Sequence, residues 1–357
     1  MSSEQLSKIS NTIKFLSADM IQSANSGHPG TPMGLSDVMS VFMNKVRHNP
    51  KNPAWLNRDR VVFSGGHASA LVYSYLYLSG YDLSMDDLKS FRRLHSKTPG
   101  HPEITTPGVE IATGPLGQGV ANAVGFAMAA KYAAHLLNEE GNEIIDHRVY
   151  CFCGDGDLQE GISDEACALA GRHNLDNLTI IYDSNGITID GSTDIAWFED
   201  VKVRFEAQGF EVARIDGHNF DQIEFVLDEV KNKTKPYLII ANTRIAKGAG
   251  ELEGSHHSHG APLGEEIIKA AKIAAGFDPE RKFAIGEDVL IRFRAAIEKG
   301  DLAEAQWNKK VENLSSESKN MLNALLNPDF SKIDFPDFSG KKLATRDSNG
   351  VIMNEIA

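Results

Sequence analysis

The feature that most constrains the fold is a recurring pair: a short run of β-branched and aromatic residues, then a turn rich in Gly, Asn or Asp. The runs are 61–64, 149–153, 178–182 and 237–240. Their continuous apolar character is typical of strands covered on both faces. Helix-length segments separate them, so we predict an α/β fold, a mostly parallel sheet with helices on both faces. Ligands of such sheets bind beyond the carboxyl ends of the strands.

The balance of charge excludes several classes of partner. With 49 acidic and 36 basic side chains among 357 residues, the formal charge is −13, whereas nucleic-acid or anionic-membrane binding requires a basic face. No apolar run reaches the roughly 18 residues of a membrane span, and the first residues lack the apolar region of a signal peptide. Three cysteines, Cys151, Cys153 and Cys167, are too few for a disulfide framework. We therefore expect a cytoplasmic protein without nucleic-acid or membrane partners.

The chain divides into three regions. The pattern of strands and Gly-rich turns continues to about residue 275, so we interpret 1–275 as one α/β domain. Residues 286–326 are charged and have a helical pattern, and we interpret 276–335 as a C-terminal helical extension and linker. The last region, 336–357, is a stub that is too short to fold alone.

Polar residues that suit a metal ion follow two of the predicted strands. Gly154-Asp155-Gly156 follows one strand and Asn185 follows the next. Mg²⁺ prefers hard oxygen ligands and keeps phosphate oxygens and water in its shell, so this set predicts an open site for a diphosphate. The flanking glycines let the backbone approach a phosphate closely. In the alternative interpretation Asp155 caps a helix and Asn185 forms a turn; the tripeptide alone favours that alternative, and its pairing with Asn185 favours the metal site.

Histidines in loops flanked by Gly or Pro are the second group of candidate residues. They are His28, His67, His101, His256 and His259. Imidazole donates, accepts and shuttles protons near neutral pH, which suits deprotonation of a sugar hydroxyl. The alternative for residues 255–259 is a zinc site, which would also need correctly spaced third and fourth ligands. Cys151 and Cys153 lie two apart in a predicted strand, so we expect both in the core.

These motifs resemble those of a known family. The stretches GDGDLQEG (154–161) and DSNGITIDG (183–191) resemble the motif of thiamine-diphosphate enzymes. Further motifs resemble transketolases closely, and they are SGHPG (26–30), SGGH (64–67), LHSKTPGHP (94–102), TGPLGQG (113–119) and SHGAPLG (258–264). The resemblance implies the thiamine-diphosphate-binding fold, a homodimer, and transfer of a two-carbon ketol unit from a ketose phosphate to an aldose phosphate in the pentose phosphate pathway. Xylulose 5-phosphate and ribose 5-phosphate are the expected substrates.

The resemblance also assigns roles to individual residues. It implies that Mg²⁺, or Ca²⁺ in its place, is bound by Asp155, Asn185 and the carbonyl of Ile187. The residues expected at thiamine diphosphate are His67, Gly114, Leu116, Asp155, Gly156, Asn185 and His259. The residues expected to be catalytic are His28, His67, His101 and His259, and those expected at the substrate are His28, His101, His259 and Arg346. Glu160 matches a family residue at the dimer interface, and its alternative is an exposed carboxylate at the start of a helix.

One part of the family's chemistry has no candidate in residues 1–357. A carboxylate must bond the aminopyrimidine ring of the cofactor, and the resemblance places it in a following pyrimidine-binding domain of the partner subunit. We therefore expect the N-terminal diphosphate-binding portion of a transketolase, inactive alone and dependent on its second half or on a separate C-terminal chain. The alternatives are another thiamine-diphosphate enzyme, such as deoxyxylulose-phosphate synthase or dihydroxyacetone synthase, and a non-catalytic assembly module.

Overall fold

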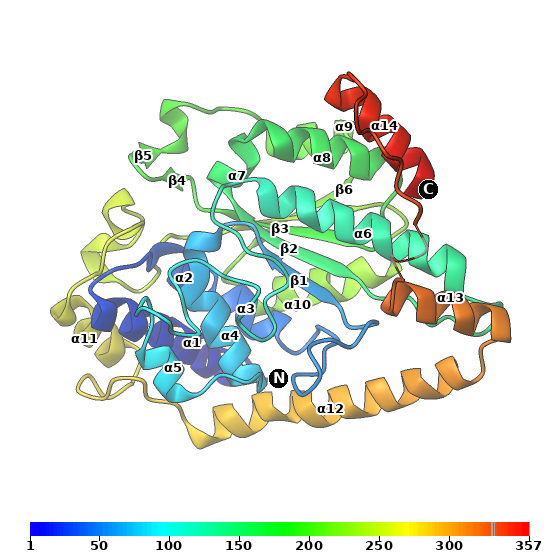
Figure 1. Cartoon of the computed structure of the whole chain (residues 1–357). Helices are drawn as coiled ribbons and strands as arrows, with labels where there is room; N and C mark the ends of the chain where they lie inside the picture. Colours follow the sequence, from blue (N-terminus) through cyan, green and yellow to red (C-terminus); the bar gives the residue numbers. More distant parts are fainter. Residues whose placement is uncertain (330, 332, 357) are drawn as a thin grey trace.

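Five parallel strands form the central sheet of the computed structural model, which describes residues 1–329, 331 and 333–356 (Figure 1). In spatial order the strands are β1 (Arg60–Phe63), β2 (Val149–Gly154), β3 (Leu178–Ser184), β7 (Tyr237–Asn242) and β6 (Glu211–Asp216). Every pairing between neighbours in this sheet is parallel. The predicted α/β class and the four predicted strands are confirmed.

The strand β6 lies outside the runs predicted from the sequence. It is an edge strand that pairs only with β7 in this sheet. Its side chains alternate in burial near its end, because Ile215 is buried whereas Arg214 and Asp216 are exposed. A strand that faces solvent on one side has no continuous apolar run, which was the signal used for the other four strands.

Helices cover both faces of the sheet. Successive residues of each strand point to opposite sides, so each strand contributes side chains to two cores. In β2, Tyr150 and Phe152 belong to one core and Cys151 and Cys153 to the other. The helices of the first core are α1 (Ser3–Ala24), α3 (Ser36–Phe42), α4 (Ser69–Ser79) and α10 (Phe220–Glu229). The helices of the second core are α6 (Gln118–Leu137), α8 (Gly161–Arg172) and α9 (Val201–Ala207). The expected core position of both cysteines is confirmed, since each is a buried free thiol.

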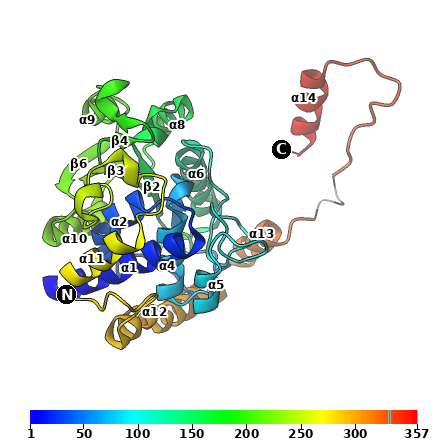
Figure 2. The same ribbon diagram turned by 90° about the vertical axis from the view of Figure 1, so that its left-hand side faces the viewer.

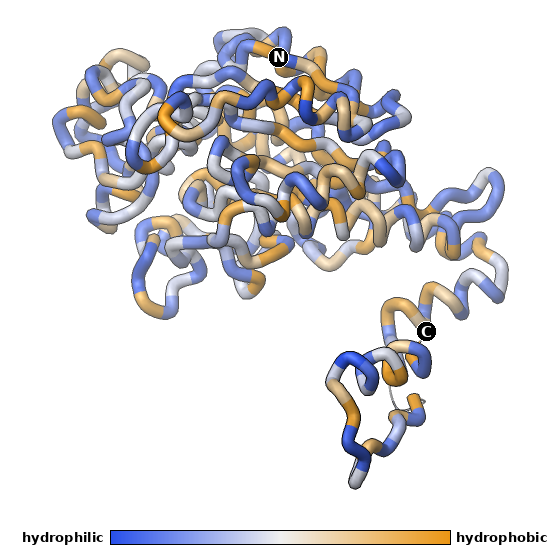
Figure 3. The backbone as a smooth tube through the Cα atoms, turned by 90° about the horizontal axis from the view of Figure 1, so that it is seen from above, coloured by the Kyte–Doolittle hydropathy of each residue, from blue (hydrophilic) through white to orange (hydrophobic). Residues whose placement is uncertain are grey.

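Two long helices occupy most of the predicted C-terminal extension. α12 (Glu287–Glu312) lies along the body and contacts α1 and α4, and α13 (Ser316–Leu326) follows after a turn capped by Ser315 (Figure 1). Gly300 permits this packing, because a Cβ there would lie 2.5 Å from the carbonyl oxygen of His48. The region predicted to be a stub contains α14 (Thr345–Ile356), which has no buried residue and lies apart from the body (Figures 2 and 3).

Short elements complete the chain between these units. They are α2 (Gly30–Gly34), α5 (Met85–Lys89), α7 (Asp155–Gln159), α11 (Glu265–Ala274) and a small antiparallel hairpin of β4 (Ile187–Thr188) and β5 (Gly191–Ser192). Within the part of the chain that the structure describes, no helix combines the length and apolarity needed to cross a bilayer.

Candidate functional site

The carboxyl ends of β2 and β3 bring the predicted metal ligands together. Asp155 starts α7 directly after β2, Asn185 follows the last residue of β3, and Ile187 starts β4. The two strands are in register up to their ends, where Gly154 pairs with Asp183. The backbone N–H of Gly186 donates to Asp155 Oδ2 at 3.2 Å, so the turn 185–187 lies against this carboxylate.

Asp155 is almost completely buried, and its environment suits a cation. Tyr182 Oη donates to Asp155 Oδ1 at 2.5 Å. Burial raises the pKa of Asp155 to about 6, although the hydrogen bonds from Tyr182 and Gly186 lower it. A divalent ion next to the carboxylate would offset this cost of burying a charge. The set of one carboxylate, one amide oxygen and one backbone carbonyl has the hard-oxygen chemistry that Mg²⁺ and Ca²⁺ require, so the residues fit the ion.

Asp183 orients the amide of Asn185, and the sequence analysis did not identify it. Asn185 Nδ2 donates to Asp183 Oδ2 at 2.9 Å, so the amide oxygen Oδ1 faces the other way, toward the N–H of Ile187 at 3.0 Å. Thr243, after β7, donates to the other oxygen of Asp183. Burial raises the pKa of Asp183 to about 7. Its position inside the motif 183–191 was the available signal, but its partner Thr243 lies 60 residues further along the chain.

Asp157, two residues after Asp155, joins three loops, and the sequence analysis did not identify it either. Its carboxylate accepts hydrogen bonds from Ser64 Oγ at 2.6 Å, from Gly117 N at 2.8 Å and from Gly154 N at 2.9 Å. These donors lie beyond β1, before α6 and at the end of β2. The same loops are closely packed, because a Cβ on Gly156 would lie 2.9 Å from Leu116 Cδ1. The predicted cofactor residues Leu116 and Gly156 therefore adjoin each other.

The four histidines predicted to be catalytic converge. The ring centroid of His28 lies 5.4 Å from that of His67, 5.7 Å from that of His259 and 6.2 Å from that of His101. The rings of His67 and His259 are 5.1 Å apart. Gly114, another predicted cofactor residue, borders this group, since a Cβ on it would lie 3.5 Å from His101 Cδ2. We call His28, His67, His101 and His259 the histidine cluster.

Burial favours the neutral form of the imidazoles in the histidine cluster. Burial is the main cause that lowers the pKa of His67 to about 3 and that of His28 to about 4, and neighbouring imidazoles contribute to both shifts. Burial also lowers the pKa of His101 and of His259. A neutral imidazole has one donor and one acceptor nitrogen, so each ring can bond a hydroxyl group and exchange a proton with it.

Arg92 sets the orientation of His28 and was not identified from the sequence. One guanidinium nitrogen, Nη2, lies 3.4 Å from His28 Nδ1, and the other, Nη1, donates to Ser26 Oγ at 2.9 Å. Because arginine only donates, Nδ1 of His28 accepts and the ring proton is on Nε2. The backbone of Arg92 has φ 59°, a left-handed conformation that is uncommon for a residue with a side chain. Its position two residues before the motif 94–102 was the only sequence signal.

Arg346 lies away from these groups, Glu160 adjoins the loop at Gly117, and the zinc alternative finds no ligand set. Arg346 is on α14, where its exposed side chain pairs only with Asp347 among the described residues. Glu160 is exposed between α7 and α8, which suits either of its two interpretations. The rings of His256 and His257 are 4.1 Å apart, but across 1–329, 331 and 333–356 no three His, Cys, Asp or Glu side chains are placed to hold a metal ion together.

Comparison with known protein families gives one match over most of the chain. Residues 5–328 match the family described as "Transketolase, thiamine diphosphate binding domain". A transketolase of Geobacillus stearothermophilus is 46% identical over 359 residues, which cover 97% of this chain and 54% of that protein. The chain thus spans about half the length of the curated relatives that it matches.

Solved structures give the same result. The crystal structure of transketolase from Campylobacter jejuni subsp. jejuni NCTC 11168 is 65% identical, with a TM-score of 0.95, and the match covers 100% of this chain and 56% of that one. A Pichia stipitis transketolase in complex with sedoheptulose-7-phosphate is 43% identical, with a TM-score of 0.86 over 90% of this chain and 48% of that one.

Proposed function

The chain belongs to the transketolase family and contains its thiamine-diphosphate-binding domain, and from this premise we propose that residues 1–357 hold the diphosphate of thiamine diphosphate through Mg²⁺. Ca²⁺ has the same ligand preference and is the second candidate ion. The whole protein would transfer a two-carbon unit between sugar phosphates. The relatives are about twice as long as this chain, so we propose that turnover also requires a region that corresponds to their other half.

The observation that carries this proposal is the meeting of two chemically different groups at the carboxyl edge of one sheet. Asp155, Asn185 and the carbonyl of Ile187 would hold the ion, while Gly154 and Gly156 would let the backbone approach the diphosphate. When bound, the cofactor would supply the electron sink for breaking a carbon–carbon bond. The histidine cluster would bind the hydroxyls of the sugar and hold or release protons at its ring nitrogens.

Sugar phosphates are the substrate class that this arrangement favours. Four neutral imidazoles at 5.1 to 6.2 Å spacing offer several donors and acceptors to a polyhydroxylated chain. The related Pichia stipitis structures include complexes with sedoheptulose-7-phosphate and with fructose-6-phosphate. Xylulose 5-phosphate and ribose 5-phosphate are the specific donor and acceptor that we propose, with Arg346 binding a phosphate once α14 is docked.

Exposed apolar side chains on the elements that follow Asp155 and Asn185 in the chain support assembly with a second chain. Large apolar side chains are exposed on α8, on α9 and around the β4–β5 hairpin, and they are Ile162, Leu169, Ile189, Ile195, Phe198 and Val203. Exposed apolar groups of this size mark interaction surfaces. We propose that a second copy, or the complementary half, covers them, with Glu160 at the same interface. The three buried free thiols also support a reducing, cytoplasmic compartment.

Two measurements test the proposal. Titration calorimetry with thiamine diphosphate and Mg²⁺ should show saturable binding that EDTA abolishes; the absence of any heat would instead support a non-catalytic module. The second measurement is product analysis with xylulose 5-phosphate and ribose 5-phosphate. We expect no turnover from residues 1–357 alone and turnover after addition of the complementary half. Full activity from these residues alone would contradict the proposal that turnover requires the other half.

A further inference from the structure

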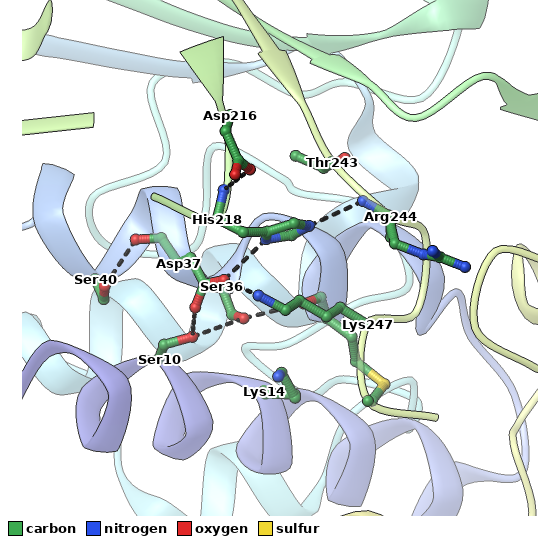
Figure 4. A network of polar contacts seen from close by, with 12 residues as sticks. Ser10, Lys14, Ser36, Asp37, Ser40, Asp216, His218, Thr243, Arg244 and Lys247 are labelled. Carbon is green, nitrogen blue, oxygen red and sulfur yellow. Dashed lines mark hydrogen bonds and ion pairs between the residues drawn. The ribbon is translucent and has the colours of Figure 1, made fainter. Parts of the chain in front are cut away.

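Three segments that are distant in sequence meet at the buried carboxylate of Asp37 (Figure 4). Ser10, on α1, donates its hydroxyl hydrogen to Oδ1 at 2.5 Å. His218 Nδ1, from the loop after β6, and Lys247 Nζ, from the loop after β7, each lie 2.8 Å from Oδ2. Only 8% of the Asp37 side chain is exposed. A buried charge with three donors is held in one geometry, because losing any donor leaves the charge poorly compensated.

His218 links Asp37 to Arg244, which lies at the start of the same loop after β7 that carries Lys247. The backbone N–H of Arg244 donates to His218 Nε2 at 3.0 Å. A backbone amide only donates, so Nε2 accepts and the ring proton is on Nδ1, facing Asp37. Figure 4 shows His218 between Arg244 and Asp37, with Lys247 reaching the same carboxylate oxygen. Asp37 therefore holds both ends of the segment 244–247.

The segment 244–247 packs against the two loops that carry His28 and His259. Ala246 N donates to the carbonyl oxygen of Gly30, two residues after His28, at 2.9 Å. A Cβ on Gly30 would lie 2.6 Å from Ile245 Cγ1 and 3.0 Å from the carbonyl oxygen of Ser258, the residue before His259. The segment thus packs against Gly30, close to His28, and Gly30 packs in turn against the residue before His259. The carbonyl oxygen of Ile245 also accepts from the N–H of Gly254, in the loop that leads to His259, at 2.9 Å.

We propose that Asp37 is a positioning residue, which holds the segment 244–247 against Gly30 and thereby sets the separation of His28 and His259. Asp37 has no contact with either ring among its hydrogen bonds and ion pairs. It acts through Lys247 and through His218. The inference rests on the proposed function only for what the two histidines do, whereas their placement by Asp37 is independent of any ligand.

The test compares Asp37→Asn with Asp59→Asn in the full chain. An amide offers one acceptor oxygen and turns an N–H toward a donor, so it cannot satisfy Ser10, His218 and Lys247 together. Asp59 is a matched control because it is equally buried and accepts two backbone N–H groups, but it lies before β1 at the opposite end of the sheet. Both variants should lower the melting temperature. Only Asp37→Asn should shift the ¹⁵N signals of the His28 and His259 rings and weaken binding of thiamine diphosphate with Mg²⁺, by about tenfold.

A second pair of variants covers the case in which Asp37→Asn does not fold. Lys247 is one-third exposed, so Lys247→Met should fold and should shift the same two ring signals, while Lys247→Arg keeps a donor and should restore them. Ring signals that match those of the wild type in Lys247→Met and in any folded Asp37→Asn would overturn the inference. If the wild type binds no thiamine diphosphate, the proposed function fails, and the ring signals still decide the role of Asp37.

Discussion

The proposed metal anchor, formed by Asp155, Asn185 and Ile187, and the histidine cluster lie at the same edge of the sheet but are built in different ways. Asp155 and Asn185 follow two neighbouring strands whose register is set by backbone hydrogen bonds up to the pair Gly154–Asp183. The histidine cluster takes one ring from each of four segments, around residues 28, 67, 101 and 259. None of these segments pairs with another as a strand in the sheet.

This difference indicates which substitutions should disturb each group. The position of the anchor depends on a backbone ladder, and its chemistry depends on one buried charge. The geometry of the cluster depends on close packing between loops, such as that of Gly30 against Ile245 and Ser258. We therefore expect single polar substitutions to remove the function of the anchor without unfolding the chain, and distant packing changes to disturb the cluster.

The largest effect is expected from Asp155→Asn. Loss of the only carboxylate among the proposed ligands should weaken binding of Mg²⁺ and thiamine diphosphate about 100-fold, measured by titration calorimetry. Without ligand the variant should be at least as stable as the wild type, because burial makes the ionised form of Asp155 costly and raises its pKa. Asp190→Asn, an exposed carboxylate in the same motif, should bind like the wild type. Equal affinity of Asp155→Asn and the wild type would contradict the anchor.

The histidine cluster should make stability depend on pH in the acid range. The pKa of His67 falls from 6.5 to about 3 in the folded chain because of burial, so the unfolded chain binds a proton that the folded chain rejects. This contribution is complete above pH 6.5 and is lost as the pH falls toward 3. Between pH 6.5 and about 4.5, the rejected proton at His67 should lower the free energy of unfolding by about 2 to 3 kcal/mol. Urea denaturation at each pH measures this loss.

His67→Asn should flatten that dependence, and the exposed His173→Asn should leave it as in the wild type. Identical pH profiles for His67→Asn and the wild type would show that the pKa of His67 is the same in the folded and the unfolded chain, which would contradict its lowering by burial.

A smaller effect is expected from Gly30→Ala, which tests the packing side of the comparison. The added methyl group must displace Ile245 and the backbone at Ser258, so we expect a loss of about 1 to 2 kcal/mol in unfolding free energy and altered signals of His28 and His259. Gly125→Ala is the matched control, because no atom lies within 4 Å of its added Cβ and it is in the middle of α6. Alanine there should raise helix stability by up to about 1 kcal/mol. A neutral Gly30→Ala would show that the loops adapt.

Much of the fold could be predicted from local patterns. The runs 149–153 and 237–240 are continuous and apolar, and the strands β2 and β7 occur there. The edge strand β6 could not be found in the same way, because one of its sides faces solvent. Asp155, Asn185 and the histidines were identified because they belong to motifs that follow strands or occupy Gly-rich loops.

The residues that were missed act through partners far away in sequence. Asp157 meets Ser64 across 93 residues, Arg92 meets His28 across 64, and His218 meets Asp37 across 181. No pattern along the chain records such pairs. A carboxylate or guanidinium in a loop has the same local signature whether it is solvated or holds two loops together.

The four apolar strands, the proposed ligand set of the anchor and the candidate histidines follow from the amino-acid sequence, because each depends on residues close together in the chain. The convergence of four imidazoles, their depressed pKa values and the hold of Asp37 on the segment 244–247 were decided only by the tertiary structure. Burial and long-range hydrogen bonds exist only once distant segments are packed against one another. They set the positions and the pKa values of the histidines.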